Sequence, residues 1–391
     1  MLLNLAFETS RRLRLRGRLL ARRARGASER VPVILVPSVL GVRLRGAWTG
    51  TLDLYRSRPL SGGGAPLGLL RGFPIVPGLW SYDCYGGLVR FLVRTGGYRL
   101  GEDLHLLDYD WRTGVVDAAA ALDELVTRLR GAGDEKLDLI GVSTGGLVAR
   151  TAMATAGADR FRRVVYIGVP QRGSLHVVEM LATGVRPAPL GRRFSPADVA
   201  ALPVSWDGLP RAGERLFVDE HGAPLEHDIL DPATWKRLGM CELPERDIAD
   251  RLAGVARLHA LLDGAPAHPD AIAIGGRNLP TAVRAKVVDG RVAFPPCDVR
   301  RDEPLKDTLY APGDGSVPAS SVSALPGLGG ERTWWVKPAA HHLLPAHPEV
   351  HRLVLEALLA PAPSATAPDP VRIRRRPEPV SAVGPAATPS T

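Results

Sequence analysis

The chain has 391 residues, of which 45% are hydrophobic and 23% charged, and its formal net charge is +9. This composition is ordinary for a protein that buries a sizeable core, and it excludes a wholly disordered chain. No stretch approaches the ~18 consecutive apolar residues that a membrane-spanning helix needs, so we do not expect the chain to cross a bilayer.

The positive charge lies at the two ends of the chain. Residues 1–30 contain nine Arg and two Glu, residues 361–391 contain four Arg, one Asp and one Glu, and these tails account for the whole +9. A basic tail is a candidate contact with anionic lipid or nucleic acid, and a solvated arm is the simpler interpretation. Because the centre is neutral, we expect no nucleic-acid partner. A peripheral contact of the N-terminal arm with an anionic membrane stays open.

The cysteines and the N-terminus bear on cofactors and location. Cys84, Cys241 and Cys297 are too few and too scattered for a disulfide framework or a zinc site. We expect no metal and no cofactor. The first residues are apolar only briefly before an Arg run begins, which is unlike a signal peptide. We therefore expect a cytoplasmic protein, with peripheral membrane association as the alternative.

The first half of the chain alternates between strand and helix patterns. The predicted elements are a strand at 31–36, a strand at 104–109, a helix at 118–130, a strand at 137–142, a helix at 145–155 and a strand at 164–169. Short apolar runs rich in β-branched residues indicate buried strands, and leucines at helical spacing indicate helices. The alternation predicts an α/β fold with a mainly parallel sheet flanked by helices.

The alternation stops over residues 171–256, which contain several Pro and Gly and two Trp and suggest an insertion lying over the core. It resumes with predicted strands at 271–275 and 332–336 and a helix at 348–359. Residues 361–391 contain eight Pro with Ala, Ser and Thr, so we predict a disordered tail there.

The sharpest motif is Gly141-Val142-Ser143-Thr144-Gly145, which follows a predicted strand and opens a predicted helix. In that context Gly-x-Ser-x-Gly is typical of a nucleophile elbow, a tight turn that lifts a serine hydroxyl above the carboxyl edge of a sheet. The structural alternative is a serine that only caps the helix. We predict that Ser143 is a nucleophile.

A serine nucleophile needs a histidine to take its proton and an acid to orient that histidine. In this type of fold the acid follows the serine along the chain. Asp314 lies in the glycine-framed loop 313–315, although an Asp-Gly turn without catalytic duty has the same pattern. Asp302 and Asp307 are weaker rivals because no glycines frame them.

The histidine should follow the acid, in the loop after a later strand. His341, His342 and His347 all come after the strand predicted at 332–336, and spacing alone does not separate them.

The tetrahedral intermediate of acyl transfer needs hydrogen-bond donors for its oxyanion. One should be the backbone N–H of Thr144, directly after the nucleophile. The other should come from the loop after the strand at 31–36, where we choose Val39.

Several segments between residues 31 and 355 follow one another in the same order as the motifs of a known family. They are Val36-Pro37-Ser38-Val39-Leu40-Gly41, the stretch from Gly97-Tyr98 to Tyr109-Asp110-Trp111-Arg112, Gly168-Val169-Pro170-Gln171-Arg172-Gly173-Ser174, Gly313-Asp314-Gly315-Ser316-Val317-Pro318, and His341-His342-Leu343-Leu344-Pro345-Ala346-His347-Pro348. Together they resemble the lecithin:cholesterol acyltransferase family of α/β-hydrolases. The last segment resembles a pattern whose first histidine is the base, and this favours His341.

The resemblance implies an α/β-hydrolase fold over residues 31–360, with 171–256 as a cap or lid over an acyl pocket. It implies a serine-dependent lipid acyl hydrolase or O-acyltransferase that forms an acyl-enzyme through Ser143, Asp314 and His341, with a lipid ester as substrate. One departure is Ser38, which stands where the family has Gly and bears on the oxyanion geometry.

Other functions remain open at this point. An esterase or lipase on small soluble esters would use the same fold and the same serine. A catalytically inactive lipid-binding protein would not need an intact Ser143, Asp314 and His341. Nucleic-acid binding would depend on the basic tails alone, because the centre of the chain is neutral.

Overall fold

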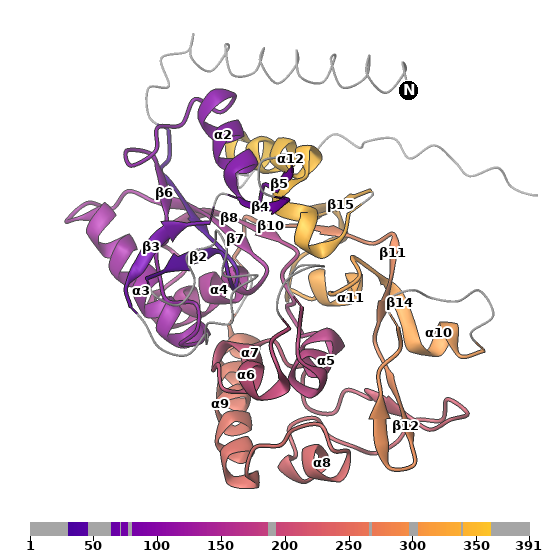
Figure 1. Ribbon diagram of the computed structural model, residues 1–391. Helices are drawn as coiled ribbons and strands as arrows, with labels where there is room; N and C mark the ends of the chain where they lie inside the picture. Colours follow the sequence, from indigo (N-terminus) through magenta and orange to yellow (C-terminus); the bar gives the residue numbers. More distant parts are fainter. Residues whose placement is uncertain are drawn as a thin grey trace, which may run out of the picture. The chain divides into compact units, whose positions relative to one another are not determined.

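The computed structural model describes residues 30–45, 64–70, 72–76, 80–186, 193–265, 268–296, 304–337 and 339–360 (Figure 1). The basic arm predicted at 1–30, apart from Arg30, and the disordered tail predicted at 361–391 lie outside these ranges. Within the described ranges, none of the helices combines the length and apolar character that a bilayer crossing needs.

A six-stranded sheet forms the centre of the molecule, in the order β15-β10-β8-β7-β1-β6 with every neighbouring pair parallel. The strands are β1 (Val33–Val36), β6 (Leu104–Leu106), β7 (Leu137–Val142), β8 (Phe161–Ile167), β10 (Ala271–Gly276) and β15 (Thr333–Val336). The predicted α/β class with a mainly parallel sheet is therefore confirmed. The strand predicted at 104–109 ends early, at Leu106, and the chain then turns so that Tyr109 and Trp111 are buried.

Helices cover both faces of this sheet. They are α2 (Gly86–Arg94) and α12 (Pro348–Leu359), which pack together, and α3 (Val115–Arg130) and α4 (Thr144–Ala156), which also pack together (Figure 1). Because both faces are covered, β1 and β7 are buried along their whole length and have near-continuous apolar sequences.

The exception in β7 is Asp138, a fully buried carboxylate. The Arg162 Nε donates to its Oδ1 at 2.8 Å, and Arg162 Nη2 also donates to the Leu358 carbonyl at 2.8 Å. The neighbouring Arg163 donates from Nη1 to the Ala360 carbonyl at 2.8 Å. The two guanidinium groups thus satisfy carbonyls at the C-terminal end of α12, where positive charge is favourable.

The strand order places a topological switch point between β1 and β7. From β1 the chain crosses through α2 to β6 on one side, whereas from β7 it crosses through α4 to β8 on the other. Loops that leave two such neighbouring strands diverge and create a crevice at the carboxyl edge, where open α/β sheets bind ligands. With the turn after β7 occupied by Gly-x-Ser-x-Gly, this arrangement is the α/β-hydrolase fold.

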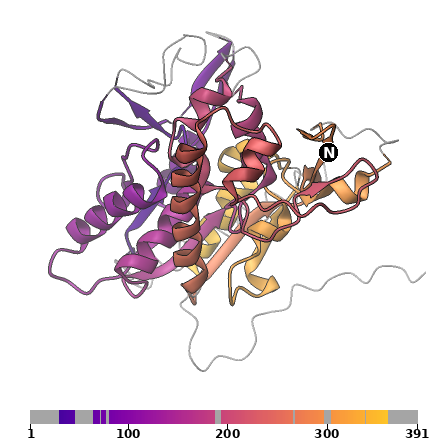
Figure 2. The same cartoon turned by 90° about the horizontal axis from the view of Figure 1, so that it is seen from below.

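Several helices separated by loops lie between β8 and β10, and residues 171–256 of this stretch are named the inserted region below. The helices are α5 (Leu175–Thr183), α6 (Pro196–Ala200), α7 (Val204–Asp207), α8 (Pro232–Arg237) and the longer α9 (Glu245–Gly264), with the two-residue strand β9 (Phe217–Val218). The α9 helix packs against α4, α7 and α8 and is the long helix near the centre of Figure 2. The predicted insertion boundary at residue 256 falls inside α9.

Two tryptophans hold this region together. Trp206 and Trp235 are 1% and 0% exposed, and their rings are tilted against each other with centroids 5.1 Å apart. Each indole N–H donates to a backbone carbonyl, of Ala200 at 2.9 Å and of Ile229 at 2.8 Å. Both side chains therefore act in packing.

Smaller elements complete the fold. They are β2 (Val42–Leu44), β3 (Pro66–Leu69), β4 (Phe73–Val76), β5 (Trp80–Tyr82), β11 (Leu279–Ala282), β12 (Ala285–Val288), β13 (Arg291–Ala293), α10 (Lys306–Leu309), β14 (Tyr310–Gly313), α11 (Ala319–Val322) and the 3-10 helices η1 (Gly330–Arg332) and η2 (His341–Ala346). The antiparallel pair β11–β14 leads directly into the loop that contains Asp314.

Candidate active site

Ser143 occupies the sharp turn between β7 and α4. Its backbone has φ 50° and ψ −122°, a conformation that residues other than glycine rarely adopt. The Ser143 N–H donates to the Ile167 carbonyl of β8 at 2.8 Å, and the Gly146 N–H donates to the Ser143 carbonyl at 2.9 Å. The strained conformation is thus held by the sheet on one side and the first turn of α4 on the other.

The turn also lies against the end of β1. A Cβ atom built on Gly145 would come within 2.3 Å of the Val36 carbonyl oxygen and 2.6 Å of the Pro37 carbonyl oxygen. Only a glycine permits this approach, because the obstructing atoms are backbone. The N-terminus of α4 and the loop after β1 are therefore adjacent.

Three of the predicted residues form a hydrogen-bonded chain. The Ser143 Oγ lies 3.0 Å from His341 Nε2, and the His341 Nδ1 lies 2.8 Å from Asp314 Oδ2. The three side chains come from loops after β7, β14 and β15, so the fold brings together residues far apart in the sequence. Because Asp314 accepts at Nδ1, the neutral imidazole has its lone pair on Nε2, facing the serine hydroxyl.

Backbone donors hold the Asp314 carboxylate in place. Asp314 is 1% exposed, and its Oδ1 accepts from the N–H groups of Ser316 at 3.1 Å and Val317 at 2.7 Å. The Gly315 N–H donates to Thr281 Oγ1 at 2.9 Å, which ties the loop to β11. One carboxylate oxygen thus fixes the side chain and leaves the other for the imidazole.

His341 is bound to Asp314 by its backbone as well, since its N–H donates to the Asp314 carbonyl at 2.9 Å. The imidazole packs on Gly168, where an added Cβ would lie 3.3 Å from Nδ1 and where φ is +59°. Burial lowers the pKa of the imidazole, but the Asp314 carboxylate raises it by more, so the pKa lies above its usual value.

The rival residues occupy other environments. His342 is exposed, and the Nδ1 of His347 accepts from the Glu349 N–H at 3.1 Å, which caps α12. Asp307 is exposed in the first turn of α10. Asp302 lies outside the described residues.

The predicted oxyanion donors lie on the two segments that meet at Gly145, the start of α4 and the loop after β1. Thr144 is the first residue of α4, so its N–H has no carbonyl one turn back to bond. Among the described residues, neither its N–H nor that of Val39 has an acceptor. Ser38 is not among the described non-glycine residues with positive φ, so its Cβ adds no backbone strain at the position where the similar family has Gly.

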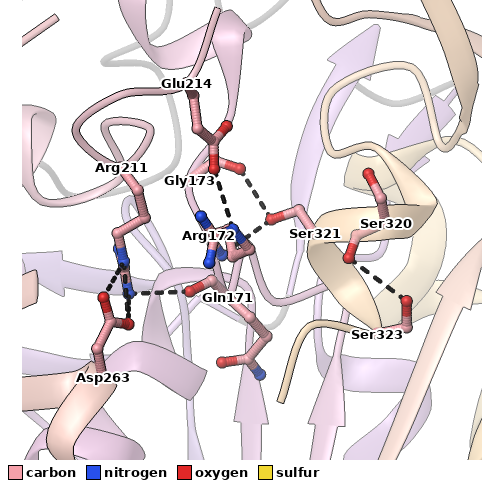
Figure 3. A network of polar contacts seen from close by, with 9 residues as sticks. All are labelled: Gln171, Arg172, Gly173, Arg211, Glu214, Asp263, Ser320, Ser321 and Ser323. Atoms are coloured by element: carbon pink, nitrogen blue, oxygen red, sulfur yellow. Dashed lines mark hydrogen bonds and ion pairs between the residues drawn. The ribbon is translucent and has the colours of Figure 1, made fainter. Parts of the chain in front are cut away.

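Gln171 and Arg172, in the loop after β8, bond Arg211 and Glu214 of the chain between β8 and β10 (Figure 3). Arg211 donates to the Gln171 carbonyl at 3.1 Å and binds both carboxylate oxygens of Asp263 at 3.1 Å. From the core side, Arg150 Nη1 donates to the Gln171 side-chain oxygen at 3.0 Å. This loop is thus fixed between α4, α9 and the inserted region.

The next two residues of the loop, Arg172 and Gly173, contact α11, which follows the loop that contains Asp314. Arg172 Nε donates to Glu214 Oε1 at 3.0 Å, and the Arg172 backbone N–H donates to Ser321 Oγ at 3.1 Å (Figure 3). The Ser321 hydroxyl donates in turn to the Gly173 carbonyl at 2.8 Å. The inserted region and α11 are therefore joined through one short loop.

Some residues that shape the site were not predicted. Thr281 bonds the acid loop and Gly168 makes room for the imidazole. Gly168 lies within one of the segments that resemble the family, whereas Thr281 has no sequence signal. Among the described residues, no group of three or more His, Cys, Asp or Glu side chains is arranged to hold a metal ion.

Comparisons with protein-family models and with curated proteins give no match. Among solved structures, this chain is similar to one in the Tle4–Tli4 complex, with 17% identity over 66% of this chain and 68% of that one and a TM-score of 0.48. It is similar to the mature lipase BlEst2 of Bacillus licheniformis, with 11% identity over 85% and 93% and a TM-score of 0.41. A Listeria innocua protein, the lin2722 gene product, has 12% identity over 84% and 94% and a TM-score of 0.36.

We predict that G145A destabilises the protein by about 3 kcal/mol, because the added methyl group meets backbone oxygens that cannot move aside. Chemical denaturation followed by circular dichroism measures the change. The matched control is G254A in α9, where the nearest atom to the new Cβ is Arg257 Nη2 at 3.8 Å. This control should be more stable than the original by about 0.5–1 kcal/mol. Equal effects of the two substitutions would contradict the close approach at residue 145.

Proposed function

We propose that this chain is a serine-dependent acyl hydrolase or O-acyltransferase that acts on lipid esters. The observation that carries the proposal is the hydrogen-bonded chain Ser143–His341–Asp314, with distances of 3.0 Å and 2.8 Å, at the switch point of a parallel sheet. The strained backbone of Ser143 supports a functional role, because a serine that only caps a helix needs no such conformation.

In the acylation step, Ser143 Oγ attacks the carbonyl carbon of the ester while its proton passes to His341 Nε2. Asp314 Oδ2 accepts the Nδ1–H and stabilises the imidazolium that forms. The oxygen that gains charge accepts from the N–H groups of Val39 and Thr144. The intermediate then collapses, the C–O bond to the alcohol breaks, and the alcohol departs with the proton from His341.

In the deacylation step, the same groups act on a second nucleophile. Water or an alcohol gives its proton to His341 and attacks the acyl-enzyme, and Ser143 leaves with that proton. Water makes the protein a hydrolase, and an alcohol makes it an acyltransferase. The inserted region, as a cap, would decide between them by how well it excludes water.

One feature favours a lipid ester over a small soluble one. The segments that resemble lecithin:cholesterol acyltransferases are spread from residue 36 to residue 348, and they include the loops around Asp314 and His341.

We predict that S143A lowers kcat/KM by about four to six orders of magnitude without changing the fold, and that D314N lowers it by about four. The measurement is ester hydrolysis together with labelling by a fluorophosphonate probe. Circular dichroism and thermal unfolding serve as the fold control. An S143A variant that keeps its activity would remove the nucleophile from the proposal.

The pH dependence follows from His341, which acts as a base only when neutral. Its pKa is raised by Asp314, so kcat/KM should fall about tenfold per pH unit below an apparent pKa above 6.5. In D314N, burial remains and the carboxylate is lost, so the residual activity should persist to lower pH. Identical profiles for the two proteins would show that Asp314 does not act on the titrating group.

Product analysis tests the substrate class. With vesicles of mixed phospholipids, mass spectrometry should detect free fatty acid and lysophospholipid, and an added long-chain alcohol should yield its ester if the protein is an acyltransferase. S143A provides the blank. Turnover of short-chain esters without any product from the vesicles would favour the small-ester alternative.

A further inference from the structure

Two buried tyrosines hold one peptide unit of the loop after β1. The Tyr109 hydroxyl donates to the Pro37 carbonyl at 2.6 Å, and the Tyr85 hydroxyl accepts from the Ser38 N–H at 2.9 Å. The two side chains are 4% and 5% exposed. The Pro37 carbonyl and the Ser38 N–H are the two ends of the same planar peptide group. Two hydroxyl groups from outside the loop therefore fix the orientation of that plane.

The next peptide unit is fixed at one end only. Its carbonyl, on Ser38, accepts from the Gly41 N–H at 2.9 Å, across a tight turn in which Leu40 has φ 62°. Its other end is the Val39 N–H, which has no acceptor among the described residues. In a trans peptide the N–H points opposite to the C=O, so the bond to Gly41 also directs the Val39 N–H.

The exit of the loop is held by a third aromatic side chain. Trp111, 1% exposed, donates from Nε1 to the Val42 carbonyl at 2.9 Å. Tyr109 and Trp111 follow β6, and Tyr85 directly precedes α2. The three side chains that bond the loop after β1 therefore come from outside that loop. Burial raises the pKa of both tyrosines, so their hydroxyls stay protonated at neutral pH.

We propose that Tyr85 and Tyr109 are positioning residues that orient the Pro37–Ser38 peptide and thereby aim the Val39 N–H at the oxyanion. The proposal rests on the proposed function of the same site. The observed bonds of the two hydroxyls are to the backbone of the loop, so we assign the tyrosines an indirect role. Their effect is preorganisation, because a donor that is already aimed costs no reorganisation when charge develops in the transition state.

The test uses Y109F and Y85F, each of which removes one hydroxyl and keeps the ring. Loss of an oxyanion donor costs about 10²–10³ in kcat, so a donor that is present but poorly aimed should cost about 10–100-fold. KM should change by less than about threefold, because the ground-state carbonyl depends little on this donor.

A second readout separates positioning from general destabilisation. A boronic acid that adds to Ser143 places a negatively charged oxygen where the oxyanion forms. Its inhibition constant should rise by the same factor as kcat/KM falls, since both report the tetrahedral state. A merely structural role would lower the melting temperature without this proportionality.

The matched control is Y310F. Tyr310 is 9% exposed and, like Tyr109, donates its hydroxyl to a proline carbonyl, that of Pro296 at 2.6 Å. Y310F should lower thermal stability to a similar extent and leave kcat and boronate affinity unchanged. If Y109F does not fold, Y85F is sufficient for the test. It removes the acceptor of the Ser38 N–H and leaves the bond from Tyr109 to the Pro37 carbonyl in place.

The outcomes distinguish this inference from the proposed function. If S143A is inactive while Y85F and Y109F keep kcat/KM and boronate affinity within twofold, the tyrosines do not position the loop and the proposed function stands. If S143A remains active, the proposed function fails whatever the tyrosine variants do. Parallel losses in both tyrosine variants, absent in Y310F, would support the inference.

Discussion

The close approach between the end of β1 and the start of α4 is the contact on which the rest of the site depends. It requires glycine at 145, and it places the loop that contains Val39 beside the N-terminus that contains Thr144. The strained backbone of Ser143 has the same origin, because the chain must turn from β7 into α4 within one residue. Hydrogen bonds to β8 and within α4 hold that conformation.

Around this contact, each functional group is held by a partner from another element. The carboxylate of Asp314 depends on backbone N–H groups, and its loop on Thr281. The loop after β1 depends on two tyrosines and a tryptophan. Charged pairs such as Arg211–Asp263 fix the loop after β8 against the inserted region. The central sheet supplies the scaffold, and side chains from outside it set the orientations.

The sequence was sufficient to predict the class of fold, the central strands and the residues that meet at the switch point. Apolar runs identify strands that are buried on both faces, and a motif in the right context locates Ser143. Spacing alone left His341, His342 and His347 equivalent, and the family resemblance favoured His341. In the structure His341 lies within hydrogen-bond distance of both Ser143 and Asp314.

The inserted region was harder to predict, for a physical reason. Its short helices are stabilised by tertiary contacts such as the Trp206–Trp235 pair, which a local pattern does not contain. Even α9 was not predicted, although Ile248, Leu252 and Val255 are buried at helical spacing. Tyr85 illustrates the same limit, because a single tyrosine before a helix does not indicate which backbone group it will bind.

The two bonds between His341 and Asp314, one through side chains and one through backbone, have a mechanical consequence. Because of these two bonds, Asp314 and His341 move together as one unit. Ser143 belongs to a different unit, anchored in β7, β8 and α4. A motion that changes reactivity must therefore change the distance between the Ser143 hydroxyl and the His341 imidazole. These two residues contact each other through their side chains and not through their backbones.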